Sequence, residues 1–313
     1  MFEQPKERFN SFFDWMYDDY EKWLLLPALM LLLAFGVIGY SYVTTGDIVN
    51  KGIEFTGGSE IKIQVNDSVS QDAIEQAFSG ELQNVRVRTL SGRGGTTWML
   101  VQTSTTFSRD SGNATANGSD IEQIGVTEQV SQLLQSHDIP HGDISAQSLG
   151  AAVSQSFLRE AQIAVALAFL IMSAVIFVAF RNFVPSMAVI LAAFTDIIVA
   201  IAGMNLIGIE LTLGSLAALL MLIGYSVDTD IVLSTRVLRQ NQGSLKERVR
   251  DSITTGATMT VGALTAFTAL FLISTSPTLD EIAAVMLLGL LADIPITWTG
   301  NAIILKMHEE GKL

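Results

Sequence analysis

The chain has 313 residues, of which 49% are hydrophobic and 16% charged, and its mean hydropathy is +0.42. Soluble proteins carry about 25% charged residues, so this composition is typical of a membrane protein. The net charge of −13 excludes a basic surface for nucleic acid, and the absence of cysteine excludes disulfides, thiolate metal sites and a cysteine nucleophile.

Six apolar stretches are long enough, or nearly so, to cross a hydrocarbon layer, which takes about 20 helical residues. They are predicted at 23–43, 163–180, 184–204, 211–233, 256–274 and 282–305. The first is uncharged, too long for the core of a signal peptide and without a small-residue cleavage site, so we expect it to remain as an anchor. The sequence therefore predicts a bundle of six transmembrane helices.

Lysine and arginine are distributed unevenly between the segments that join the spans. The connecting loops 205–210 and 275–281 contain no lysine or arginine, whereas the segments on the opposite side of the membrane contain Lys22, Arg181 and Arg236 among others. Because basic residues collect on the cytoplasmic side, both termini are predicted to be cytoplasmic. Ser244 and Glu247 have capping-box spacing, which predicts a short surface helix in the last cytoplasmic loop. The chain is therefore expected to lie in the cell membrane, with residues 1–22 in the cytoplasm, 23–43 as the first span and 44–158 as a domain outside. Residues 159–306 are expected to form five further spans, and 307–313 a cytoplasmic tail.

In the predicted outside domain, some segments alternate apolar and polar residues as strands do, and others repeat apolar residues at helical spacing. Strands are predicted at 60–65, 84–90, 96–103 and 143–149, and helices at 70–78 and 121–136. The order strand, helix, strand, strand, helix, strand (βαββαβ) is that of a ferredoxin-like α+β domain. The loop 104–120 carries glycosylation-type triplets at Asn113 and Asn117, a pattern that also arises by chance. No spacing in this block predicts a catalytic or metal site.

Four aspartates lie inside the predicted spans, at Asp196, Asp228, Asp230 and Asp293. A carboxylate at the bilayer centre costs about 2.5–3.5 kcal/mol, and no lysine or arginine lies mid-span to pair with it. Each must therefore be protonated, bind a cation, face a hydrated cavity or pair with another chain. Asp228 and Asp230 are about 200° apart on a helix, so they cannot face one direction and either could be structural.

Further polar residues continue along the sixth span. Pro295, Thr297 and Asn301 follow Asp293, and Pro295 removes a backbone hydrogen bond and predicts a kink. Hydrogen bonding between helices is the plainer explanation of such residues. The cost of several mid-span carboxyl groups nevertheless favours a polar path for ions.

Two segments resemble signatures of one family. Residues 52–58, Gly-Ile-Glu-Phe-Thr-Gly-Gly, resemble the GIDFTGG-type signature of SecF, with Gly52, Phe55, Thr56, Gly57 and Gly58 as the matching positions. Residues 224–236 resemble the SecF segment that usually begins Gly-Tyr-Ser, here Gly224, Tyr225 and Ser226, and they end at Arg236. One anchor, an outside domain and five further spans is also the SecF layout. The chain is therefore identified as a member of the archaeal-type SecF family.

This resemblance implies membership of the resistance–nodulation–division superfamily, a complex with SecD, and association with a SecYE-type translocon. It also implies that a proton or sodium gradient helps to draw the exported polypeptide outward, with no other cofactor. Bacterial members tend to have Asn-Asp where this chain has Asp228 and Thr229, so the usual carboxylate falls on Thr229. The candidate ion-path residues are thus Asp196, Asp228, Thr229, Asp230 and Asp293.

Two other functions fit some of these features. An intramembrane aspartyl protease would need two aspartates to share a water molecule, and Asp228 with Asp293 is the candidate pair, although the Gly-x-Gly-Asp pattern of such enzymes is absent. A scaffold, in which the spans only anchor the outside domain, would tolerate asparagine at all four mid-span aspartates. No GxxxxGK[ST] loop is present, so ATP is not the expected energy source.

Overall fold

The computed structural model describes residues 13–15, 17–66, 69–90, 96–105, 118–239, 243–274 and 276–312. The chain divides into two compact units, one formed by Met1–Asn50 with Ile163–Leu313 and the other by Lys51–Gln162. We call them the membrane unit and, after the location predicted from the sequence, the outside unit. Each contains buried hydrophobic clusters of its own. The glycosylation-type triplets at Asn113 and Asn117 begin outside the described residues.

Within the described residues, six helical spans are long and apolar enough to cross a membrane, as predicted. Five of them are α3 (Leu25–Thr45), α7 (Ala151–Phe180), α8 (Phe183–Ile207), α9 (Leu213–Arg239) and α10 (Leu245–Ile273). The sixth span is composite and runs through α11 (Pro277–Pro295), the π-helix η1 (Ile296–Asn301) and α12 (Ala302–Glu309). A short helix, α2 (Tyr20–Trp23), precedes α3.

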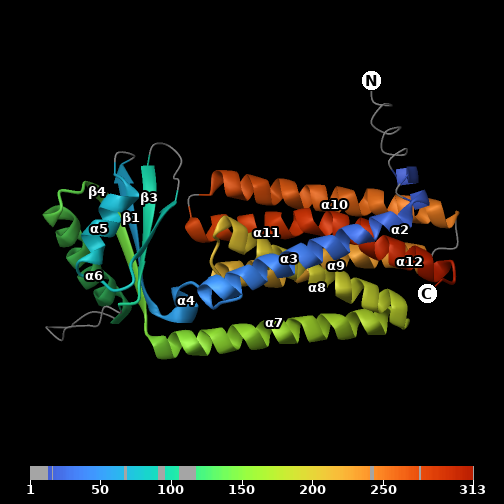
Figure 1. Ribbon diagram of the computed structural model, residues 1–313, viewed down its shortest axis with the longest axis horizontal. Helices are drawn as coiled ribbons and strands as arrows, with labels where there is room; N and C mark the ends of the chain where they lie inside the picture. Colours follow the sequence, from blue (N-terminus) through green and yellow to red (C-terminus); the bar gives the residue numbers. More distant parts are fainter. Residues whose placement is uncertain are drawn as a thin grey trace, which may run out of the picture. The chain divides into compact units, whose positions relative to one another are not determined.

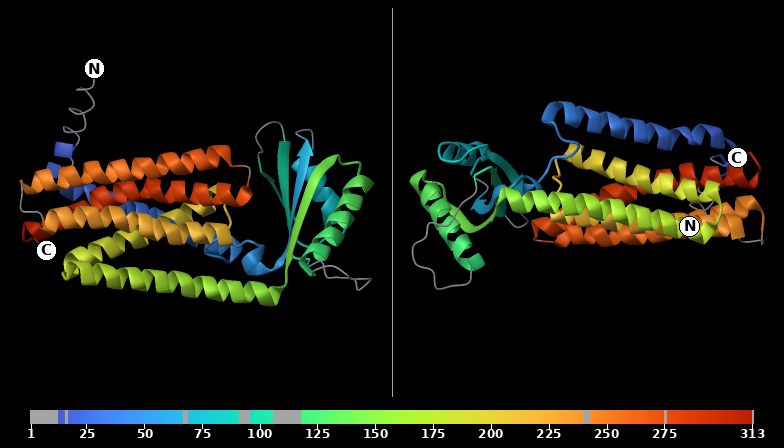
Figure 2. Two further views of the ribbon diagram at one scale, coloured as in Figure 1. Left: turned by 180° about the vertical axis from the view of Figure 1, so that it is seen from behind. Right: turned by 90° about the horizontal axis from the view of Figure 1, so that it is seen from below.

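The spans differ sharply in how much of their surface is buried. About half of the apolar stretch is buried in α8 (56%), α9 (50%) and the sixth span (56%), against 11% in α3, 6% in α7 and 11% in α10. The views of Figures 1 and 2 agree that α8, α9 and α11 run side by side. Polar groups on these three helices are therefore the ones that the bundle itself encloses.

Two helices begin earlier than hydropathy predicts. Helix α7 starts at Ala151, and α10 starts at Leu245. The predicted capping box is present: the Glu247 amide donates to Ser244 Oγ (3.3 Å), and the Ser244 amide donates to Glu247 Oε2 (2.8 Å). It opens the 29-residue α10, so the prediction of a separate short surface helix is wrong. Both helices continue from apolar into polar sequence without a helix-breaking residue, and hydropathy marks only the apolar part.

The outside unit contains a four-stranded antiparallel sheet with the strand order β2-β3-β1-β4. Its elements are α4 (Ile53–Thr56), β1 (Gly58–Asn66), α5 (Gln71–Ser79), β2 (Arg86–Leu90), β3 (Thr96–Thr103), α6 (Gly118–Ser136) and β4 (His141–Leu149). Helices α5 and α6 cover one face of the sheet (Figures 1 and 2). Ile61, Ile63 and Val65 of β1 alternate toward these helices and pack with Phe78 and Leu134.

Two consecutive glycines begin the sheet. Gly57 has φ 78° and Gly58 has φ 121°, conformations that glycine adopts far more readily than other residues. A Cβ on Gly57 would lie 3.0 Å from Ala151 Cα, and a Cβ on Gly58 would overlap the carbonyl oxygen of Thr103. Close backbone packing at the start of β1 therefore requires both glycines.

Replacing Gly58 with alanine is expected to destabilise the outside unit by about 1–3 kcal/mol, because the added methyl group must push β1 away from β3. Hydrogen exchange of the β1 and β3 amides in the full-length protein would measure the change. Gly80→Ala is the matched control, since its Cβ would meet no atom within 4 Å and its φ is −74°. Equal exchange in the two variants would contradict the prediction.

Candidate functional site

Three of the four mid-span aspartates lie together inside the membrane unit. Asp196 comes from α8, Asp230 from α9 and Asp293 from α11, the three most buried spans. Their relative exposures are 0%, 0% and 1%. We call these residues the carboxyl cluster. It assembles because each aspartate is on the inward face of an enclosed helix.

Asp230 receives two hydrogen bonds from the sixth span. Its Oδ1 atom accepts from Thr297 Oγ1 at 3.0 Å and from Asn301 Nδ2 at 2.7 Å. Thr297 and Asn301 are themselves buried, each with 1% exposure. Two donors on one oxygen fix the position of this carboxyl group between α9 and the sixth span.

The Thr297 hydroxyl also joins Asp230 to the other aspartates. Thr297 Oγ1 lies 3.0 Å from Asp293 Oδ1 and 3.0 Å from Asp230 Oδ1. Asp293 lies near Asp196, whose Oδ2 accepts from the hydroxyl of Ser226. A continuous line of polar groups thus runs from α8 through α11 to α9.

The number of hydrogens on this line limits its protonation. A threonine hydroxyl has one hydrogen and can donate it to one carboxyl oxygen only. For both contacts of Thr297 to be hydrogen bonds, either Asp230 or Asp293 must carry a proton and donate it to Thr297 Oγ1. The geometry therefore fits a cluster that holds both ionised and protonated carboxyl groups.

No basic side chain among the described residues acts on the cluster; the groups that do are carboxyl, hydroxyl and amide groups. Four buried oxygen atoms around it have no hydrogen-bond partner in the described part of the chain: Asp196 Oδ1, Asp230 Oδ2, Ser234 Oγ and Asn301 Oδ1. Leaving such an atom unpaired costs about 1–3 kcal/mol. The described residues thus leave several polar atoms of the enclosed helices unpaired around the cluster.

Asp228 does not belong to the cluster. It is exposed on α9, on the side opposite to Asp230, as the helical spacing predicts. Thr229, where the bacterial carboxylate would fall, is 6% exposed, and its Cγ2 would lie 2.9 Å from a Cβ on Gly256. Thr229 therefore packs on α10. The structure thus brings together Asp196, Asp230 and Asp293 and leaves Asp228 and Thr229 outside this group.

Thr297 and Asn301 were placed in a polar path by the sequence, but their contact with Asp230 was not predicted. The position of Thr297 four residues after Asp293 indicates that the two can touch on an α-helix. Asn301 gives no such signal, because its position depends on the π-helical turn. The structure does not bring the candidate protease pair together, since Asp228 is exposed on α9 whereas Asp293 of α11 is buried against Thr297.

Comparison with known families supports the resemblance seen in the sequence. Residues 129–310 match the family model described as "Protein export membrane protein SecD/SecF, C-terminal". A "Protein-export membrane protein SecF" from Methanocaldococcus jannaschii is 34% identical over 94% of this chain and 97% of its own length. The corresponding protein of Pyrococcus furiosus is 36% identical over 94% of this chain and 94% of its own length. That of Haloferax volcanii is 36% identical over 91% of this chain and 91% of its own length.

The chain belongs to the SecF family of protein-export membrane proteins. Its fold also resembles that of a larger family member. The crystal structure of a Thermus SecDF, described as a translocon-associated membrane protein, matches 94% of this chain with a TM-score of 0.70 at 20% identity. The chain covers 38% of the length of that protein. This structural match includes both units of the chain, so both have the fold of that protein.

The SecF signature residues fall into two groups. Gly52, Phe55, Thr56, Gly57 and Gly58 belong to the outside unit, where Phe55 is buried and the two glycines begin β1. In the second signature, Ser226 is the direct partner of Asp196.

The other residues of this second signature shape the contact between α9 and α10. The Arg236 guanidinium donates to the Asp251 carbonyl (2.9 Å), and the Tyr225 ring meets the edge of Phe267 with centroids 6.1 Å apart. Gly224 has no atom within 4 Å of a Cβ placed on it. One signature residue is therefore part of the site, and Arg236 and Tyr225 join α9 to α10.

Proposed function

We propose that this protein is the export subunit that, with a SecD partner at a SecYE-type translocon, uses a proton gradient to assist movement of polypeptides across the membrane. The curated relatives carry the name of protein-export proteins. The observation that carries the ionic part of the proposal is the Thr297 hydroxyl, which lies 3.0 Å from both Asp230 and Asp293.

This arrangement has the atoms for a balanced proton transfer. Protonated Asp293 donates its proton to Thr297 Oγ1 while the Thr297 hydroxyl gives its own hydrogen to ionised Asp230. The net result is a proton moved from α11 to α9, with threonine unchanged. Rotation of the hydroxyl resets the bridge for the next proton. Asp196, hydrogen-bonded by Ser226, is the group that supplies Asp293 or receives its proton.

The choice of the proton over sodium rests on the same groups. A hydroxyl placed between two carboxyl groups can exchange hydrogens with both, which a sodium path does not require. We therefore infer that the coupling ion is the proton.

A partner half in the membrane is supported by Asp228. This carboxyl group is exposed on α9 within an apolar span, where contact with lipid would cost about 2.5–3.5 kcal/mol. Tyr225, one turn before it, is 42% exposed. In pseudo-symmetric transporters the substrate and ion sites lie near the middle of the membrane, at the interface between two repeats. We propose that a SecD-type half covers this face of α9.

The remaining arrangement is proposed on the same basis. The termini are cytoplasmic, the protein lies in the cell membrane, and the outside unit faces away from the cytoplasm, in agreement with the distribution of basic residues. The strand order β2-β3-β1-β4, with both helices on one face, supports assignment of the outside unit to the ferredoxin-like class. This unit is proposed to contact the translocating polypeptide.

Replacing Thr297 with valine tests the proton bridge. Valine has nearly the same shape but no hydroxyl, so proton-driven export is expected to fall about 100-fold, whereas Thr297→Ser keeps the hydroxyl and much of the activity. Export by the reconstituted complex would be measured under an imposed pH gradient. Full export by Thr297→Val would show that protons do not pass through this residue.

A further inference from the structure

The sixth span changes its helical geometry at the carboxyl cluster. Pro295 ends α11, and the next turn, η1 from Ile296 to Asn301, is a π-helix. Single π-helical turns inside α-helices are rare and are found most often at functional sites. Here the turn contains Thr297 and Asn301, the two residues whose side chains donate hydrogen bonds to Asp230.

The wider turn explains how Asn301 reaches Asp230. If all eight steps from Asp293 were α-helical, Asn301 would lie about 80° around the helix from Asp293. With roughly 80° per residue through η1, Asn301 returns to within about 20° of Asp293. Conversion of η1 to α-helical geometry would therefore turn Asn301 away from Asp230 by roughly 100°.

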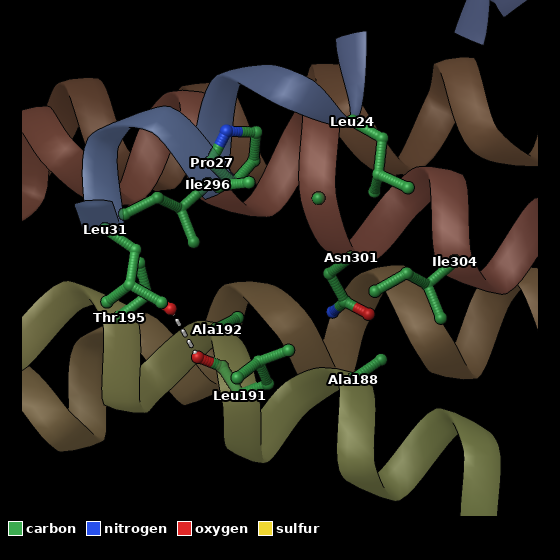
Figure 3. Close-up of a pocket in the computed structure, with 12 residues that line it drawn as sticks. Leu24, Pro27, Leu31, Ala188, Leu191, Ala192, Thr195, Ile296, Asn301 and Ile304 are labelled. Carbon is green, nitrogen blue, oxygen red and sulfur yellow. Dashed lines mark hydrogen bonds between the residues drawn. The ribbon is translucent and has the colours of Figure 1, made fainter. Parts of the chain in front are cut away.

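The space beside η1 can accommodate such a change. A cavity of about 300 Å³ lies between α3, α8 and η1. Figure 3 shows Asn301 and Ile296 projecting into it from the last span, opposite Ala192 and Thr195 of α8. Asn301 Oδ1 has no hydrogen-bond partner in the described part of the chain. Asn301 is therefore held from one side only, by its bond to Asp230.

The first span contacts the same turn. A Cβ on Gly300 would lie 3.2 Å from Pro27 Cγ and 3.6 Å from Pro27 Cβ, so η1 and α3 touch at this glycine. A rotation of η1 would replace Gly300 at this contact with a larger neighbour and would displace α3. The end of α12 is also tied to the N-terminal segment, because Lys306 Nζ donates to the Tyr17 carbonyl at 2.7 Å.

We propose that Asn301 is a positioning residue for Asp230 and that η1 alternates between a π-helical form, which holds Asp230 toward Thr297, and an α-helical form, which releases it. This inference rests on the proposed proton transfer. In the π-helical form Asn301 and Thr297 both donate to Asp230 and keep it ready to accept a proton. In the α-helical form Asp230 loses the Asn301 donor, and the movement of Gly300 is passed to α3. Proton transfer is thereby coupled to motion of the span that precedes the outside unit.

A reversible cross-link between α3 and η1 tests this proposal. The 3.6 Å Cβ–Cβ separation at positions 27 and 300 is within the range of about 3.5–4.5 Å that disulfides require. The chain has no cysteine, so Pro27→Cys with Gly300→Cys introduces a single pair. In the complete complex, oxidation is expected to form the cross-link and abolish proton-driven export, and reduction is expected to restore it. The two single variants, treated with the same oxidant, are the matched controls.

Export by the oxidised double variant at the rate of its reduced form would overturn the alternation of η1. Failure of the two cysteines to cross-link would overturn the contact on which it depends. These results are separable from a failure of the proposed function. If Asp230→Asn exports normally, the proton path itself is wrong; if Asp230→Asn is inactive but the cross-linked protein is active, only the role of η1 is wrong.

Deletion of Thr299 provides a second variant, in which the turn cannot alternate although Asn301 still faces Asp230. Removing one residue converts a π-helical turn to a continuous α-helix and leaves Asn301 within about 20° of Asp293. We expect the variant to assemble with its partners and to lose proton-driven export, because the turn can no longer change form. An assembled deletion variant with normal export would show that the π-helical turn serves packing only.

Discussion

Asp230→Asn is expected to reduce proton-driven export about 100-fold or more while leaving the protein folded and assembled. The amide oxygen of asparagine can still accept hydrogen bonds from Thr297 and Asn301, so the contacts of α9 with the sixth span are retained. What is lost is the capacity to bind and release a proton. Export by reconstituted complexes under an imposed pH gradient would measure the effect, with assembly checked by co-purification.

The control for this variant is Asp251→Asn, which makes the same chemical change at an exposed aspartate of α10. Normal export is expected for this control. If Asp230→Asn also exports normally, the carboxyl cluster only joins helices, and the scaffold hypothesis becomes the better account. Asp293→Asn should behave like Asp230→Asn, because the Thr297 hydroxyl needs a carboxyl group on each side.

The residues of the cluster could be found from the sequence, but their grouping could not. Mid-span aspartates are conspicuous because they are costly in a membrane, and all three members were among the four candidates. Spacing on α9 showed that Asp228 and Asp230 face opposite ways. It could not show which of them faces the bundle interior, since that depends on the packing of α8 and α11 around α9. The structure places Asp230 in the interior and Asp228 at the surface of the bundle.

The role of Asn301 escaped prediction for a different reason. Sequence analysis assumes one helical period along a span, and a π-helical turn changes that period locally. Pro295 signalled a break in regular hydrogen bonding, but a kink, a π-turn and an unwound segment all follow from the same lost amide. Only the resulting register decides whether Asn301 faces Asp230 or the surface.

The fold followed more directly from elementary patterns. Apolar length located six spans, and alternating or helical periodicity located the strands and helices of the outside unit in their observed order. Boundaries were wrong at α7 and α10, because both helices continue into sequence that is polar enough to leave the membrane. Hydropathy indicates which part of a helix is surrounded by lipid. The ends of the helix are determined by backbone hydrogen bonding, which continues beyond the lipid.

Contact between α9 and α11 determines the distances within the cluster, and Gly289 on α11 makes that contact possible. A Cβ on Gly289 would overlap the side chain of Leu222 on α9, which is 0% exposed. Gly289→Val is therefore expected to force the helices apart and destabilise the membrane unit by about 3 kcal/mol. Because Asp230 and Asp293 are on these helices, export should be lost as well.

Leu222→Ala should correct this defect, because it removes as many carbon atoms as Gly289→Val adds. On its own, Leu222→Ala leaves a cavity and is expected to cost about 2–5 kcal/mol. Since each change compensates for the other, the double variant should be more stable than the sum of the two losses predicts, by up to about 3 kcal/mol. Thermal unfolding of the three variants in detergent would measure this coupling, and recovery of export in the double variant would link the α9–α11 distance to proton transfer. Strictly additive losses would mean that these two residues do not set the spacing of the helices that hold Asp230 and Asp293.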